Sequence, residues 1–240
     1  ARTAHAMAYD SARGVAVLFG GWNGSDYLGD TWQLGAQPQP HGAWADVSPG
    51  SGPAARGSHA TVYDSQRGVT VLFGGSISAT LLGDTWEWDG VSWTQAATTG
   101  PSARSDHAMV YDSQRGVTVL FGGYNSGQLG DTWEWDGTSW TQVAITGPPA
   151  PARAYHSMAY DSQRGVIVLF GGYSGGGYGN WLGDTWEWDG STWTQVATTG
   201  PSERLDTRLV YDSARGVTVL FGGVGSQFQN DTWEWNGNTW

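Results

Sequence analysis

Two short motifs recur along the chain and constrain its fold more than any other feature. Each repeat carries Leu-Phe-Gly-Gly, and Asp-Thr-Trp follows it. The first motif begins at Leu18, Leu72, Leu120, Leu169 and Leu220, and the second at Asp30, Asp84, Asp131, Asp184 and Asp231. The copies lie roughly 50 residues apart, a period typical of proteins in which each repeat forms one structural unit. Five such units account for the whole chain.

Each repeat contains four segments with the pattern of β-strands. In the third copy, residues 107–112 and 116–123 are β-rich runs joined by a short polar link, which predicts a hairpin. Residues 131–136 alternate large apolar with acidic side chains, and a short turn leads to a further run from Trp140, which predicts a second hairpin. We name the four strands A to D. Four antiparallel strands per repeat at this period indicate a β-propeller blade.

The repeat resembles the kelch repeat in its bacterial form. The family's marks are a double glycine after strand B, a Tyr-Asp pair that ends strand A and a Trp that opens strand D. In the third copy they are Gly122, Gly123, Tyr111, Asp112 and Trp140. The resemblance implies an all-β, five-bladed kelch-type β-propeller with strand A innermost. It implies little about activity, because function resides in sites grafted onto a fold.

We expect one domain over residues 1–240. Its predicted blades cover approximately residues 1–52, 53–100, 101–149, 150–200 and 201–240. Trp240 is the first residue of the last strand D, so this outer strand is truncated. We expect blade five to pack against blade one and close a ring, the alternative being part of a larger array with flanking domains. The exposed edge of blade five also invites self-association.

Composition and charge exclude several classes of partner. The net charge is −11 and all eleven basic residues are arginine, so the chain would repel a nucleic acid. No apolar run is long enough to span a membrane. The absence of cysteine excludes a disulfide framework and any thiolate metal site. No cofactor and no metal site is predicted.

Side chains that recur in every blade favour structural roles. Fourteen of the sixteen Trp occupy three repeated slots, which predicts packing within and between blades. A histidine slot near the start of strand A holds His5, His59, His107 and His156, but Thr207 in blade five. Blade geometry spaces these histidines too widely for one ion, so we interpret them as structural.

Arginine occupies two further slots. One lies in the A–B turn, where an Asp three residues earlier is expected to bind turn amides or the guanidinium. The other precedes strand A, as at Arg104. Arginines of this second slot either pair with the Asp of the repeat or present guanidinium groups to an anion at the mouth of the channel. We favour pairing.

The aromatic residues outside these slots predict the binding site. Strand alternation places the B–C and D–A connections at one end of the blades, and all eight of these aromatic residues lie in such connections. Variable loops on a rigid scaffold are where binding residues usually lie. The predicted ligand-binding residues, including two charged ones near the channel mouth, are Trp22, Tyr27, Tyr124, Tyr155, Tyr173, Tyr178, Trp181, Glu203 and Arg208.

We therefore predict a non-catalytic binding module for a glycan or a peptide, with a polysaccharide preferred. A structural or adhesive repeat domain of a larger surface protein is the first alternative. The second is a carbohydrate-active enzyme similar to kelch-type sialic acid epimerases, which the arginines with Glu203 leave open. The copper site of galactose oxidase and the iron pattern of nitrile-specifier proteins are not present in the sequence. We expect an extracellular or cell-surface location.

Overall fold

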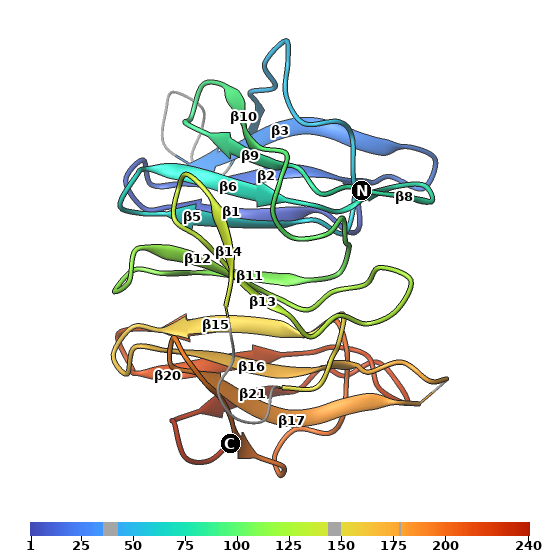
Figure 1. The fold of residues 1–240 in the computed structure, drawn as a ribbon, viewed down its shortest axis with the longest axis vertical. Coiled ribbons are helices and arrows are strands. Elements are labelled where there is room, and N and C mark those ends of the chain that lie inside the picture. The colour runs from blue at the N-terminus through green and yellow to red at the C-terminus, as the bar shows by residue number, and fades with distance from the viewer. Residues whose placement is uncertain (36–42, 144–149, 178) are drawn as a thin grey trace. The chain divides into compact units, whose positions relative to one another are not determined.

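The computed structural model describes residues 1–35, 43–143, 150–177 and 179–240. All regular secondary structure in these ranges is β-strand, so the all-β prediction is confirmed. Antiparallel pairing groups the strands into one sheet per repeat, and we call these sheets blades one to five (Figure 1). No helix in the described part of the chain has the length and apolar character needed to cross a membrane.

The strands follow one another across each blade in chain order. Blade one consists of β1 (Ala6–Asp10), β2 (Val15–Trp22), β3 (Tyr27–Gly35) and β4 (Trp44–Asp46). Blade two consists of β5 (Ala60–Asp64), β6 (Val69–Phe73), β9 (Thr85–Trp88) and β10 (Trp93–Ala97), with β7 (Ser76–Ile77) and β8 (Thr80–Leu81) as a separate small hairpin. Blade three consists of β11 (Ala108–Asp112), β12 (Val117–Phe121), β13 (Thr132–Trp135) and β14 (Trp140–Gln142).

Blade four consists of β15 (Ser157–Asp161), β16 (Val166–Tyr173), β17 (Trp181–Trp188) and β18 (Trp193–Ala197). Blade five consists of β19 (Arg208–Asp212), β20 (Val217–Phe221) and β21 (Thr232–Trp235). Strands A to D are thus confirmed in four blades, and blade five has strands A to C, as the sequence predicts.

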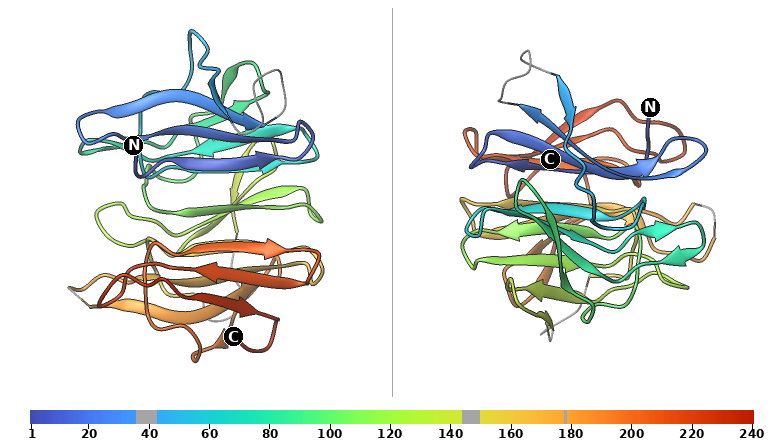
Figure 2. Two further views of the ribbon diagram at one scale, coloured as in Figure 1. Left: turned by 180° about the vertical axis from the view of Figure 1, so that it is seen from behind. Right: turned by 90° about the horizontal axis from the view of Figure 1, so that it is seen from above.

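The chain divides into two compact units. The first comprises residues 1–105, 116–118 and 135–141, and the second comprises residues 106–115, 119–134 and 142–240. In the first unit β1 lies beside β5, and in the second β15 lies beside β11 and β19 (Figure 2). The expected packing of blade five against blade one involves both units and stays a prediction.

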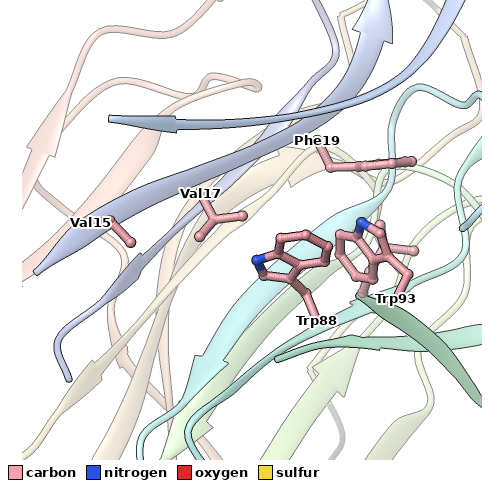
Figure 3. Packing of buried hydrophobic residues seen from close by; sticks show 6 residues of the cluster. Val15, Val17, Phe19, Trp88 and Trp93 are labelled. Carbon is pink, nitrogen blue, oxygen red and sulfur yellow. The ribbon is translucent and has the colours of Figure 1, made fainter. Parts of the chain in front are cut away.

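Apolar side chains two residues apart on strand B form the core between neighbouring blades. In the first unit, Val15, Val17 and Phe19 project from one face of β2 toward Trp88 and Trp93 of blade two (Figure 3). Period-two spacing places them on one face because successive side chains of a strand alternate. Burying an aromatic ring of 150–250 Å² contributes about 4–6 kcal/mol gross at roughly 25 cal/mol per Å².

A repeated hydrogen bond also joins each blade to the next. The indole Nε1 of the strand D Trp donates to the threonine Oγ1 of the Asp-Thr-Trp motif in the preceding blade. The pairs are Trp93–Thr31 at 2.9 Å, Trp140–Thr85 at 2.8 Å, Trp193–Thr132 at 3.0 Å and Trp240–Thr185 at 2.8 Å. The structural role predicted for the Trp that opens strand D is confirmed in blades two to five.

Candidate functional site

The B–C connection of one blade lies against the segment that leads into the next blade. In the second unit the amide of Arg153 donates to Leu129 O at 2.9 Å, and that of Arg204 donates to Leu182 O at 3.0 Å. In the first unit the amide of Arg56 donates to Leu28 O at 3.0 Å. We call this end of the blades the loop face. Within each unit, the prediction that both kinds of connection share one end is confirmed.

On the loop face of blade four, a glycine-rich insert lies between β16 and β17. Tyr173 binds the backbone of this insert. Tyr173 and Trp181 are directly opposite each other where β16 and β17 end. The Tyr173 hydroxyl donates to Gly177 O at 3.1 Å and accepts from the Gly177 amide at 3.3 Å. Gly177 has a φ of 129°, a left-handed conformation that glycine adopts without strain. The Tyr173 ring is thereby held at the base of the insert, opposite Trp181.

These rings form part of a cavity of about 510 Å³ in the second unit. The cavity is lined by Tyr155, Tyr173, Gly177, Gly179, Trp181, Leu205, Val224 and Gly225. Three predicted site residues therefore meet at this cavity. Tyr173 and Trp181 belong to blade four, and Tyr155 lies in the segment that leads into it. Tyr178, also predicted, lies outside the described residues.

Sequence reasoning missed the aliphatic part of the lining. Val224 follows the double glycine of blade five and so occupies the slot that Tyr173 occupies in blade four. This slot forms a β-bridge with the residue that follows the arginine before strand A of the same blade, as in Ala154↔Tyr173 and Leu205↔Val224. The useful signal was the variable residue after each double glycine, whatever its chemical type.

A second variable slot has an unusual backbone conformation. Two positions after each arginine that precedes strand A, a residue other than glycine has a left-handed backbone. The values of φ are 54° at Ala4, 53° at Ser58, 56° at Asp106, 60° at Tyr155 and 54° at Asp206. Such a residue costs on the order of 1–3 kcal/mol, and this strain often accompanies functional sites. Backbone hydrogen bonds link the slots of the second unit, from the amide of Tyr155 to Asp106 O at 2.9 Å and from that of Asp206 to Tyr155 O at 3.0 Å.

Two aspartates act on the Tyr155 hydroxyl. Burial, together with the charge of Asp106 and its hydrogen bond to the hydroxyl, raises the pKa of Tyr155 to about 12, and Asp206 adds to this shift. Partial desolvation also raises the pKa of Asp206, although this residue is exposed to solvent; Arg208 opposes the shift and Asp106 adds to it. The cavity wall at Tyr155 is therefore an aromatic surface with carboxylates beside it.

The other predicted site residues lie apart from the lining. Trp22 and Tyr27 are opposite each other in blade one, with ring centroids 5.0 Å apart. Tyr124 is 41% exposed. Glu203 is exposed. A Cβ added to the lining residue Gly225 would lie 2.7 Å from the carbonyl oxygen of Glu203, so the backbone of Glu203 borders the cavity. Arg208 is exposed and donates from Nη1 to Thr207 O at 3.0 Å.

The arginines before strand A are bound within their own blades. Each guanidinium donates to the aspartate of the Asp-Thr-Trp motif, in the pairs Arg2–Asp30, Arg56–Asp84, Arg153–Asp184 and Arg204–Asp231. Arg153 is fully buried and also donates to Gly171 O at 2.9 Å. The predicted pairing is confirmed. The turn arginines bind their aspartates as expected, for example Arg67 Nε with Asp64 Oδ2 at 2.7 Å.

Two histidines of the repeated slot pack against the preceding blade. His59 and His156 are buried, and each meets the edge or face of a phenylalanine of the preceding blade, Phe19 at 5.6 Å and Phe121 at 5.5 Å between ring centroids. Burial lowers the pKa of both histidines to about 3, and a neighbouring arginine contributes. Across the described ranges no group of three or more His, Asp and Glu side chains is placed to hold a metal ion.

Comparison with known proteins supports the family resemblance. The family model of the KLHDC2/KLHL20/DRC7 Kelch-repeats domain matches residues 87–240, more than half of the chain. No curated protein matches the chain at a significant level.

Proposed function

We propose that the chain, which belongs to the kelch-repeat family, is a binding module. Its sheets are the blades of a five-bladed kelch β-propeller, and this fold typically serves protein interactions. Its ligand, a peptide or a glycan, lies on the loop face of the second unit. Under this proposal the module is non-catalytic and acts outside the cell or at its surface.

The cavity of blades four and five is the observation that carries this proposal. Binding sites are usually concave and largely apolar, with a few polar groups nearby. The lining of Tyr155, Trp181, Leu205 and Val224 has this character, and residues outside the repeat template supply most of it. The bracing of the blade four insert by Tyr173 pre-organises one wall, which reduces the entropy lost on binding.

The two alternatives have less support. An acid–base enzyme at the loop face would draw on the arginines before strand A, but the guanidinium groups of Arg56, Arg153 and Arg204 are buried and paired with aspartates. A purely structural repeat has no use for a cavity lined largely by side chains outside the repeat template.

Screening the immobilised chain against a random peptide library and a glycan array tests the proposal. We expect at least one ligand whose binding is lost in Trp181→Ala and weakened in Val224→Ser. Phe228→Ala is the matched control, because Phe228 is an aromatic residue of the blade five loop that is 87% exposed and does not line the cavity. Thermal melts show that each variant is folded. If every ligand found binds folded Trp181→Ala and Val224→Ser as well as the parent chain, the proposal is wrong.

A further inference from the structure

The order of side chains along the linked left-handed slots points to the chemistry of the ligand. Asp106, Tyr155 and Asp206 occupy equivalent positions in successive blades, and their backbones are joined by hydrogen bonds of 2.9 and 3.0 Å. A tyrosine that lines the cavity is thus flanked on both sides by a carboxylate. Since these hydrogen bonds join the backbones, the Cα atoms of the three residues have a fixed spacing before any ligand arrives.

The lining offers few hydrogen-bonding groups to a sugar. Both tyrosine hydroxyls are already engaged, that of Tyr155 with Asp106 and that of Tyr173 with Gly177. The remaining described lining residues are a tryptophan, two aliphatic residues and glycines. A glycan would have to exchange the hydrogen bonds of its hydroxyls with water for apolar contact, which is costly. The cavity therefore favours a ligand group that is largely apolar along its length.

An arginine or lysine side chain meets both requirements. Its methylene stem packs on apolar surface such as Leu205 and Val224, while its cationic end is attracted to aromatic faces and carboxylates. Two arginines lie two residues from Asp206 in sequence. Arg204 is paired with Asp231, and Arg208 is exposed and bound to Thr207 O rather than to the cavity lining. The chain as a whole, with a net charge of −11, also attracts a basic partner.

We propose that the cavity binds an arginine or lysine side chain of a peptide partner, with Tyr155 and Trp181 packing on it and Asp206 and Asp106 receiving its charge. This inference rests on the proposed function, since it names the ligand class of the same cavity. The aromatic and aliphatic lining packs on the ligand side chain, and the carboxylates of Asp106 and Asp206 select a cationic one.

Isothermal titration with a hexa-arginine peptide tests this inference, with a hexa-citrulline peptide and a neutral hexasaccharide as matched probes. We expect the arginine peptide to bind at least 10-fold more tightly than the citrulline peptide, and the sugar not to bind. Asp206→Asn and Asp106→Asn should each weaken arginine binding at least fivefold. Asp26→Asn removes the same charge from an exposed loop of blade one and should change binding less than twofold.

Two results would overturn the inference. Equal binding of the arginine and citrulline peptides would show that charge is not recognised, and equal weakening by Asp26→Asn and Asp206→Asn would show only general attraction to an acidic protein. In either case a library ligand that depends on Trp181 would leave the proposed function intact. If every ligand bound Trp181→Ala as tightly as the parent chain, both proposals would be wrong.

Discussion

Trp240 donates its indole N–H to Thr185 Oγ1 at 2.8 Å, and its ring centroid lies 5.4 Å from that of Phe170. It also packs on Trp235 of its own blade at 5.5 Å. Trp193, within a complete strand D, makes the equivalent contacts with Thr132, Phe121 and Trp188. A single residue therefore reproduces the contact by which strand D joins its blade to the preceding one.

Thr132→Val tests the contribution of this hydrogen bond. The substitution keeps the shape of the side chain but leaves the buried N–H of Trp193 without an acceptor, which costs about 1–3 kcal/mol. Urea unfolding followed by tryptophan fluorescence should show a loss of stability of this size. Thr232→Val is the matched control, since Thr232 occupies the same slot in blade five but is exposed. Equal losses in the two variants would contradict the prediction.

The two arginine slots should differ in their effect on stability. Arg153 is fully buried, and Arg153→Met leaves Asp184 and Gly171 O without their guanidinium donor, which should cost roughly 3–5 kcal/mol. The side chain of Arg215 is 52% exposed, so Arg215→Met, which removes its pairs with Asp212 and Glu234, should cost far less than Arg153→Met. Unfolding curves for the two variants measure the difference, and a cost below about 1 kcal/mol for Arg153→Met would refute the buried-pair argument.

Most of the fold could be predicted from the sequence because the repeat supplies five independent copies of the same information. A Trp, an Arg or an Asp that recurs in one slot has a role that the slot defines, and Trp193, Arg153 and Asp184 all have the roles predicted for them. The period-two pattern of strand C likewise gave β13 and β17 correctly.

The site was predicted less completely, because its determinants are local backbone conformations that the residue types do not reveal. Aspartate adopts a left-handed backbone more often than most residues, but tyrosine does not, so nothing about Tyr155 as a residue type indicates this conformation. Leu205 and Val224 were missed because the search selected aromatic and charged residues, whereas apolar lining residues look like ordinary strand residues.

Acid should destabilise the protein through its buried histidines before its carboxylates titrate. The pKa of His59 and of His156 is lowered to about 3 in the folded state, from 6.5 in the unfolded chain. Between these values the unfolded state binds more protons, so stability falls as the pH falls from 6.5 toward 3. At pH 5 each histidine should already account for a loss of about 2 kcal/mol.

The double substitution His59→Thr and His156→Thr isolates this effect, because Thr207 fills the same slot in blade five and is also buried. We expect the variant to be less stable at pH 7 but to lose much less stability than the parent chain between pH 6.5 and pH 5. Urea unfolding at both pH values gives the two slopes. Parallel slopes would mean that these histidines do not titrate on unfolding.

The hydroxyl of Tyr173 should matter for binding rather than for folding. Tyr173→Phe keeps the ring opposite Trp181 but removes both hydrogen bonds to Gly177, so the insert of blade four loses its brace. Because the hydrogen bonds of Tyr173 lie at an exposed loop, the free energy of unfolding should change by less than about 0.5 kcal/mol. Amide exchange at Gly177 should become faster, and affinity for a Trp181-dependent ligand should fall several-fold, since the insert must then be ordered on binding. Tyr9→Phe, at a tyrosine of β1 that is 63% exposed, is the control and should change neither measurement. Unchanged exchange at Gly177 together with unchanged affinity would show that the hydroxyl does not pre-organise the cavity wall.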